Sequence, residues 1–151
     1  MDIKTFLNAK GGRLITITPD ANIVDAVALM MQHRIGSLPV VEDGQLVSII
    51  TERDILFAVN NHLEELPNLK VRAIMAKDIV TCDASCKVAD AMNLMFDNRL
   101  GRRIRHLPIL EEGKLVGVVS NGDLLNALLD QVSFENRIMK NYIKNWPEET
   151  A

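Results

Sequence analysis

The chain has 151 residues, a formal net charge of -3, 48% hydrophobic residues and 25% charged residues. This length suffices for a packed core without disulfides, and the composition is close to that of ordinary globular domains. The weakly negative charge argues against a nucleic-acid partner, which requires a basic face, and an aromatic share of only 4% argues against base-stacking platforms.

The N-terminal segment MDIKTFLNAK mixes charged and apolar residues and contains no apolar run of signal-peptide length. No later stretch approaches about 18 uncharged apolar residues, so we expect no membrane insertion and a cytoplasmic location. The segment IKTFLNAKGG predicts a short helix that ends at Gly11-Gly12.

Two stretches of the chain share one pattern. ITITPDANIVDAVALMMQHRIG, residues 15–36, matches VTCDASCKVADAMNLMFDNRLG, residues 80–101, at a constant offset of 65. Each stretch predicts a short strand, a turn and a helix, because its apolar residues then recur at helical spacing. These apolar residues, whose methionines we interpret as core residues, are Ile23, Ala26, Val27 and Met30 in the first copy and Val88, Ala91, Met92 and Met95 in the second.

The pattern continues after that helix. SLPVVEDGQLVSIITERDILFAV matches HLPILEEGKLVGVVSNGDLLNAL at an offset of 69, because the second copy has four extra residues within GRRIRH. Each copy predicts a β-hairpin with Gly44 or Gly113 in its turn, followed by a helix that begins at a hydroxyl residue, Thr51 or Ser120.

The chain therefore divides at the repeat boundaries. Residues 1–61 form a first repeat with an N-terminal helix, residues 62–131 a linker helix (VRAIMAKD) and a second repeat, and residues 132–151 a C-terminal amphipathic tail. Neither repeat of about 60 residues buries its sheet and helix faces well alone, so we expect the two to pack together about a pseudo-two-fold axis.

Cys82 and Cys86 lie in CDASC, a spacing that matches no common redox or zinc pair, and the chain has no second pair. We interpret both as reduced, partly buried thiols and expect no metal site.

The two repeats resemble a tandem pair of cystathionine-beta-synthase (CBS) domains. The resemblance covers residues 2–130 and rests on ITPDANIVDAVALMMQHRIGSLPVVEDGQLVSIITERDIL, on VTCDASCKVADAMNLMF and on RHLPILEEGKLVGVVSNGDLL. It implies an α+β fold of two β-α-β-β-α repeats and a stand-alone regulatory module without catalytic residues. It also implies a flat homodimer, a regulated partner protein that the sequence does not identify, and an adenosine-containing ligand in the clefts between the repeats. The expected ligand is AMP, with ATP, ADP, NAD(H) and S-adenosylmethionine as alternatives.

Each repeat has an acid three residues after the hydroxyl, Asp54 after Thr51 and Asp123 after Ser120. This spacing is close to a capping box, which predicts a helix start and nothing more. A carboxylate can also accept both hydroxyl protons of a ribose diol, so the two interpretations are compatible. Gly117 allows a flat ring to approach the strand closely, and Ser48 takes its place in the first copy.

A basic segment in the second copy, NRLGRRIRH, offers cations for the phosphates of a nucleotide. A solvated loop explains each arginine equally well, and His106 is alternatively a structural histidine. The cations are Arg99, Arg102, Arg103, Arg105 and His106.

The resemblance implies how these residues divide between two sites. Arg105 and His106 serve the site of Thr51 and Asp54, whereas Gly36 and Ser37 serve the site of Ser120 and Asp123. The strand starts near Ile15 and Val80 supply backbone contacts to the adenine edge. Because only one repeat has the basic insertion, we expect the two sites to differ in what they bind.

Two other classes of function are alternatives for this chain. The chain lacks GxxxxGK[ST], GxGxxG and HExxH, and its three histidines, His33, His62 and His106, stand beside no evident nucleophile, so we expect no catalysis. A purely structural dimerisation module without a ligand is the second alternative, and the retention of both acids and of the arginine cluster argues against it.

The tail, LLNALLDQVSFENRIMKNYIKNWPEET, predicts one or two amphipathic helices. Its apolar face either packs against its own chain or, as we favour, forms an intersubunit contact. The apolar residues are Leu125, Leu128, Val132, Met139, Tyr142 and Trp146.

Overall fold

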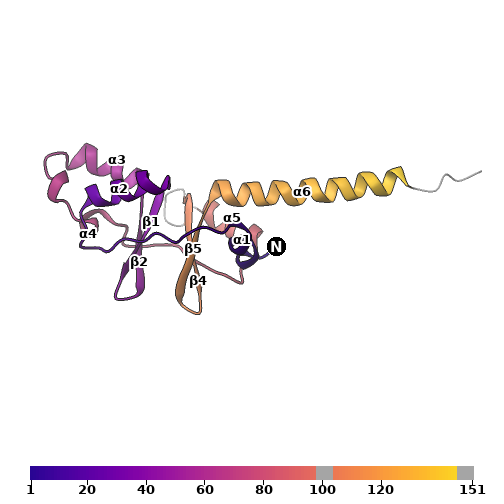
Figure 1. The fold of residues 1–151 in the computed structure, drawn as a ribbon, viewed down its shortest axis with the longest axis horizontal. Coiled ribbons are helices and arrows are strands. Elements are labelled where there is room, and N and C mark those ends of the chain that lie inside the picture. The colour runs from indigo at the N-terminus through magenta and orange to yellow at the C-terminus, as the bar shows by residue number, and fades with distance from the viewer. Residues whose placement is uncertain (98–103, 146–151) are drawn as a thin grey trace, which may run out of the picture.

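A computed structural model of the chain describes residues 1–97 and 104–145 and shows two lobes, each built on one repeat (Figure 1). Its helices are α1 (Ile3–Lys10), α2 (Ile23–His33), α3 (Glu52–Asn61), α4 (Val71–Ile74), α5 (Val88–Phe96) and α6 (Asn121–Lys144), with a 3-10 helix η1 (Leu66–Asn68). Its strands are β1 (Ser37–Glu42), β2 (Gln45–Thr51), β3 (Cys82–Asp83), β4 (His106–Glu111) and β5 (Lys114–Ser120). The expected α+β fold is confirmed.

The helices that follow the first turn of each repeat bury the predicted face. In α2 the buried residues are Ile23, Ala26 and Met30, and in α5 they are Val88, Ala91 and Met95. Met30 and Met95 are 6% and 1% exposed, so both are core residues as expected. The helical spacing read from the sequence was therefore correct in both copies.

Both predicted hairpins are present, and they have the same register. Ser37 lies opposite Thr51 in the β1–β2 pair, and His106 lies opposite Ser120 in the β4–β5 pair. Gly44 and Gly113 both have φ of 77°, a left-handed conformation that glycine adopts without steric cost, and each therefore closes its turn.

The strand expected at the start of each repeat is shorter than predicted. In the second repeat it is the two-residue strand β3, which runs parallel to β4, and in the first it is a single bridge between Ile17 and Val40. Pro19 follows Ile17 by two residues and has no N–H to continue the ladder, and a turn begins there.

The helix that precedes each repeat in the sequence packs in the other lobe. Ile3 of α1 donates its N–H to Cys86 O at 2.8 Å, whereas Val71 of α4 donates to Ala21 O at 2.9 Å. Figure 1 shows α1 beside α5, in the lobe of β4 and β5. The predicted boundary between residues 61 and 62 follows the sequence repeat. Each preceding helix, however, packs against the lobe on the other side of that boundary.

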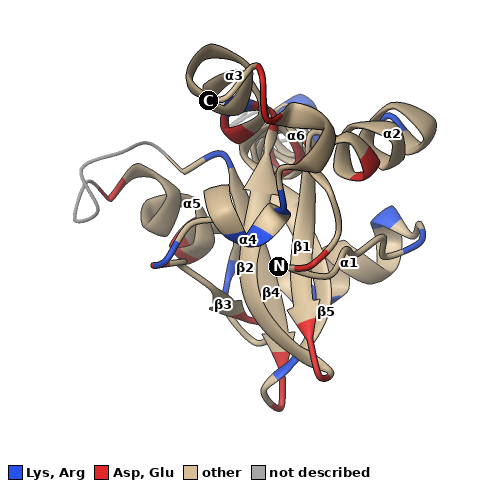
Figure 2. Cartoon of the chain, turned by 90° about the vertical axis from the view of Figure 1, so that its left-hand side faces the viewer, with Lys and Arg blue, Asp and Glu red and all other residues tan. Residues whose placement is uncertain are grey.

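Each of these preceding helices also forms an ion pair with a hairpin tip, where acidic residues gather (Figure 2). Lys4 Nζ of α1 lies 2.6 Å from Glu111 Oε1, and Arg72 of α4 pairs with Glu42 in the same way. These pairs are exposed, so their contribution is small, but they repeat the same packing arrangement in both lobes.

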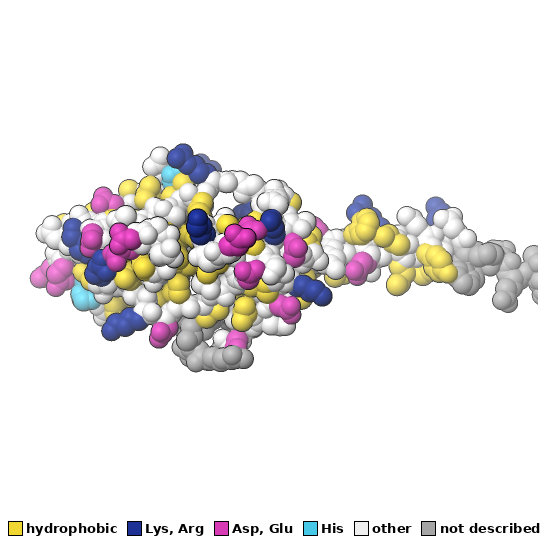
Figure 3. Space-filling model, turned by 90° about the horizontal axis from the view of Figure 1, so that it is seen from below, with side chains coloured by type: hydrophobic (Ala, Val, Ile, Leu, Met, Phe, Trp, Pro, Cys, Tyr) yellow, Lys and Arg dark blue, Asp and Glu magenta, His cyan; other side chains and the backbone are white. Residues whose placement is uncertain are grey.

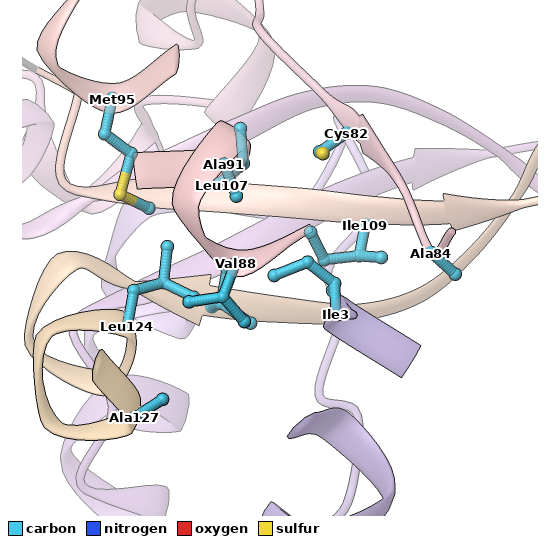
Figure 4. Packing of buried hydrophobic residues seen from close by; sticks show 11 residues of the cluster. Ile3, Cys82, Ala84, Val88, Ala91, Met95, Leu107, Ile109, Leu124 and Ala127 are labelled. Carbon is cyan, nitrogen blue, oxygen red and sulfur yellow. The ribbon is translucent and has the colours of Figure 1, made fainter. Parts of the chain in front are cut away.

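Each lobe has its own apolar core, and each fully buried Leu, Ile, Val or Met side chain contributes about 1.5–3 kcal/mol. Figure 4 shows the second core, in which Ile3 lies near Val88 and Ile109. The first core consists of Ile17, Ile23, Ala26, Met30, Leu38, Val40, Ile50 and Val71. The second consists of Ile3, Cys82, Ala84, Val88, Ala91, Met95, Leu107, Ile109, Val119, Leu124 and Ala127.

Helix α6 is one continuous helix that leaves the body of the molecule (Figure 1). Leu124 and Ala127 anchor its first turns in the second core, and every residue from 129 to 145 is exposed. Leu128 of the predicted apolar face is partly buried against the second core, whereas the predicted face beyond residue 128 is exposed as far as the structure describes it. Trp146 lies outside the described residues. Among the described helices, none combines the length and apolar character needed to cross a membrane.

Candidate functional site

The two acids that follow the hydroxyl residues both cap their helices. Asp54 Oδ2 accepts from the N–H of Thr51 at 2.8 Å and from its hydroxyl at 3.1 Å. Asp123 Oδ2 accepts from the N–H of Ser120 at 3.0 Å, and Ser120 Oγ accepts from the N–H of Asp123 at 3.0 Å. The capping-box interpretation is confirmed in both repeats. These bonds use Oδ2 of each acid, so the caps leave Oδ1 to other partners.

The residues before each Leu-Pro dipeptide sit at the helix start of the same repeat. The N–H of Glu52 donates to Gly36 O at 3.1 Å, and the N–H of Asn121 donates to Arg105 O at 2.9 Å. The two helix starts are thus built in the same way, and the equivalent contact appears in each repeat.

A pocket of about 990 Å³ brings together five of the predicted site residues: Thr51, Asp54, Val80, Arg105 and His106. Thr51 and Asp54 come from the first repeat and the other three from the second, so the pocket lies between the repeats, as expected. The remaining lining residues are Ile49, Glu52, Arg53, Leu56, Phe57, Ala76, Ile79 and Ile104.

The lining has two chemical halves. Ile49, Ile79 and Ile104 supply apolar surface, whereas Asp54 supplies a carboxylate and Arg105 a guanidinium. The volume is near the upper end of that of ordinary ligand pockets, and the lining combines seven apolar residues with six polar or charged ones, which fits a ligand that has both a flat ring and polar groups.

Ser48, which replaces Gly117 in the first repeat, does not obstruct this pocket. Its side chain is fully buried, and its hydroxyl donates to Ala76 O at 2.7 Å. The hydroxyl therefore holds the segment after α4 in place beside the strand.

The residues predicted for the other site do not line this pocket. Ser120 and Asp123 cap α6, where Asp123 is paired with Lys10 Nζ at 2.8 Å. Ser37 is buried opposite Thr51 in the first hairpin, and Ile15 packs against the first core.

Gly36 lies where the two repeats meet. A Cβ built on this residue comes within 2.6 Å of Glu52 Oε1 and 3.3 Å of His106 Nε2. Glycine thus leaves room for these two side chains, one from each repeat, beside the backbone. Gly36 therefore contacts the side chain of a residue that lines the first pocket, although the resemblance placed Gly36 in the second site.

His106 is mostly neutral in this environment. Burial lowers its pKa, and the charges of Arg105 and Lys10 add to that effect, whereas Glu52 and Asp123 oppose it. At neutral pH the side chain is therefore a hydrogen-bonding group more than a cation, which differs from the role that the basic segment suggested.

Asp123 remains ionised. Partial burial raises the pKa of this carboxyl, but the hydrogen bonds from Lys10 and Ser120 outweigh it, so the pKa lies below its ordinary value of 3.8. The pair with Lys10 therefore joins two charged groups across 113 residues of sequence.

Three arginines of the basic segment, Arg99, Arg102 and Arg103, lie outside the described residues. Of that segment the structure places Arg105 and His106 at the pocket.

The described residues contain no group of three side chains suited to a metal ion. Cys82 is buried and Cys86 half-buried, and both are free thiols, as expected. Burial, with a hydrogen bond to Cys86, raises the pKa of the Cys82 thiol to about 12, so this group is a core residue without nucleophilic character.

Some residues that line the pocket or contact the second repeat were not predicted from the sequence. Ala76 and Ile79 line the pocket, and their position just before Val80 was a usable signal. Lys10 of α1 reaches the second helix start, and Leu7 of α1 reaches Gly117 in β5. No sequence signal connects these residues to the second repeat, because each contact spans most of the chain.

Comparisons with known proteins agree with this architecture. The family model described as CBS domain matches residues 12–61 and 71–130. The CBS domain-containing protein CBSX3, mitochondrial, of Arabidopsis thaliana is 34% identical over 94% of this chain and 71% of its own length.

Solved structures have the same fold. The CBS-domain containing protein ATU1752 from Agrobacterium tumefaciens is 32% identical, with a TM-score of 0.76 over 84% of this chain and 98% of that one. CBSX2 of Arabidopsis thaliana, solved in complex with AMP, is 25% identical, with a TM-score of 0.68 over 85% of this chain and 96% of that one. The chain therefore belongs to the CBS domain family and contains two CBS domains in tandem.

Proposed function

We propose that this protein is a regulatory module that binds an adenosine-containing nucleotide, with AMP as the first candidate, in the pocket between its repeats. The observation that carries the proposal is the convergence of Thr51, Asp54, Val80, Arg105 and His106, which are far apart in the sequence, on one pocket of about 990 Å³.

The pocket has a suitable group for each part of such a ligand. Asp54 keeps Oδ1 outside its helix cap, and this oxygen accepts from a ribose diol by charge-assisted hydrogen bonds. The backbone near Val80, with Ile79 and Ile104, faces the flat base. Arg105 faces the phosphate, to which its planar fork of donors is well matched.

AMP is favoured over its alternatives because a family member of the same fold, CBSX2, has been solved with AMP. ATP, ADP, NAD(H) and S-adenosylmethionine share the adenosine group that Asp54 and Val80 recognise in this proposal. Which of these ligands binds depends on the residues at the phosphate end of the pocket.

We also propose that the protein assembles as a homodimer and acts on a regulated partner. Apolar side chains run along the projecting part of α6 (Figure 3), with Val132, Ile138 and Tyr142 each more than 50% exposed. An apolar helix face of this length is unfavourable in water without a covering surface. A second copy of the chain covers it symmetrically in this proposal.

Thermal unfolding with and without AMP tests ligand binding. A ligand that binds only the folded state adds about 2.7 kcal/mol at 100 times its dissociation constant, so AMP should raise the melting temperature clearly. Mass spectrometry of nucleotides released from freshly purified, denatured protein identifies the natural ligand. No shift with any of the five ligands, and no released nucleotide, would leave the dimerisation module without a ligand as the better proposal.

Two further measurements address assembly and catalysis. Deletion of residues 133–151 should convert a dimer into a monomer by light scattering, and an unchanged dimer contradicts the intersubunit role of the tail. Nucleotide hydrolysis by the purified protein contradicts a purely regulatory role.

A further inference from the structure

Helices α1 and α4 hold equivalent positions in the two lobes but differ in length. Asp2 bridges to Lys87 before α5, and Lys70 bridges to Asn22 before α2. The residue after each bridge, Ile3 or Val71, is fully buried. Because α4 ends four residues later and α1 continues to Lys10, α1 has one additional turn without a counterpart in the first lobe.

The additional turn places a cation on the acid of the second helix start. Lys10 Nζ lies 2.8 Å from Asp123 Oδ2 and 3.5 Å from Val118 O. This contact engages Oδ2, which also accepts from the N–H of Ser120, and the positive charge of the lysine leaves the carboxylate less available to the hydroxyls of a ribose diol.

The same turn also covers the strand where a flat ring has to approach. A Cβ built on Gly117 lies 2.9 Å and 3.2 Å from the two Cδ atoms of Leu7, so Leu7 fills the space that the missing side chain leaves. In the first repeat the equivalent strand position, Ser48, is bonded to a backbone carbonyl, and the neighbouring pocket is open.

We propose that the last turn of α1 is an intramolecular occupant of the second site, so that the free protein binds one nucleotide per chain at Asp54. A second nucleotide binds at Asp123 only when Leu7 and Lys10 are displaced. This inference rests on the proposed function and deepens it, because it assigns the inequality of the two sites to named residues.

The last turn of α1 is held by few interactions, so it can be displaced from the second site. The start of α1 is fixed by Ile3 in the second core and by the Lys4–Glu111 pair. Its end is held by the Lys10–Asp123 pair, whose side chains are 39% and 29% exposed, and such pairs contribute little in water. Gly11 and Gly12 follow with φ of 63° and 97° and act as the hinge.

The test counts AMP molecules per chain by calorimetry and equilibrium dialysis on the full chain. The wild type should bind about one AMP per chain, and the double variant Leu7→Ala/Lys10→Gln about two, with the second dissociation constant at least about tenfold lower than in the wild type. Adding Asp123→Asn to the double variant should weaken the second binding event about ten- to hundredfold, and adding Asp54→Asn should weaken the first by a similar factor.

Controls keep the result interpretable. Lys140→Gln removes an exposed lysine of α6 and should leave the count at one. Lys10→Gln alone retains Leu7 and should lower the second dissociation constant less than the double variant does. This single variant replaces the double variant in the test if the double variant does not fold.

The outcomes separate the two proposals. Two equal sites in the wild type, or a single site in every α1 variant, overturns the occupant while leaving the proposed function intact. Absence of AMP binding by all proteins overturns both.

Discussion

Asp54 and Asp123 hold the same position in the two repeats and face different surroundings. Each caps its helix from the third residue, with nearly the same hydrogen-bond lengths. Asp54 opens onto a pocket, whereas Asp123 is paired with Lys10. The local motif thus determines the helix start, and the element packed over it determines whether the site is open.

The largest effect is expected from Ile3, which attaches α1 to the second lobe. Ile3→Ala removes a fully buried side chain and should lower the free energy of unfolding by about 2–5 kcal/mol, measured by urea denaturation. Met31→Ala, at a position that is 75% exposed, is the control and should change it little. Equal stability of the two variants would mean that α1 is not part of the second core.

The second-largest effect is expected on AMP binding when only the charge of one of the two acids is removed. Asp54→Asn should weaken AMP binding about ten- to hundredfold, since a charge-assisted contact of roughly 1.5–3 kcal/mol is lost. Asp123→Asn should have a smaller effect, because its carboxylate is already paired.

The melting temperature of both ligand-free Asn variants should stay nearly unchanged, because Asn and Asp cap helices about equally well. If both variants bind AMP as the wild type does, both acids serve as helix caps only. Asp130→Asn, at an exposed acid on α6, is the matched control.

A third effect concerns the anionic end of the ligand at the open site. Arg105→Ala should weaken AMP binding about tenfold and increasingly so at low salt, while binding of plain adenosine is preserved. Calorimetry with both ligands measures the difference. Equal losses for AMP and adenosine would assign Arg105 to the fold instead of to the phosphate.

The smallest effect is expected at the start of α6, where Lys10 pairs with Asp123. Lys10→Gln should lower the free energy of unfolding by at most about 1 kcal/mol, because the pair is partly exposed. The pKa of Asp123 is below 3.8 in the folded protein, so the unfolded state binds more protons as the pH falls.

The contribution of the Lys10–Asp123 pair is therefore complete above pH 3.8 and disappears as the pH falls through the lower pKa of the folded state. Acid titration of wild type and Lys10→Gln should show their stabilities converging in that range. A difference that persists at the acid end would mean that Lys10 acts through packing instead of charge.

The sequence by itself determined the repeats, the helix faces, both hairpins and both capped helix starts. These features depend on residues that are near one another along the chain: helical spacing in 23–30, the turn at Gly44, and the three-residue step from Thr51 to Asp54. The resemblance to the CBS family added the pairing of Asp54 with Arg105 and His106, which the pocket brings together.

Only the tertiary structure decided which helix lies over which repeat. The segment before each repeat is adjacent in sequence to one lobe but packs in the other, because Ile3 and Val71 fill the cores there. One additional turn in α1 then brings Lys10 to Asp123 and Leu7 to Gly117. Contacts across more than 100 residues depend on how the buried surfaces of two lobes fit together, and no local pattern of residues encodes them.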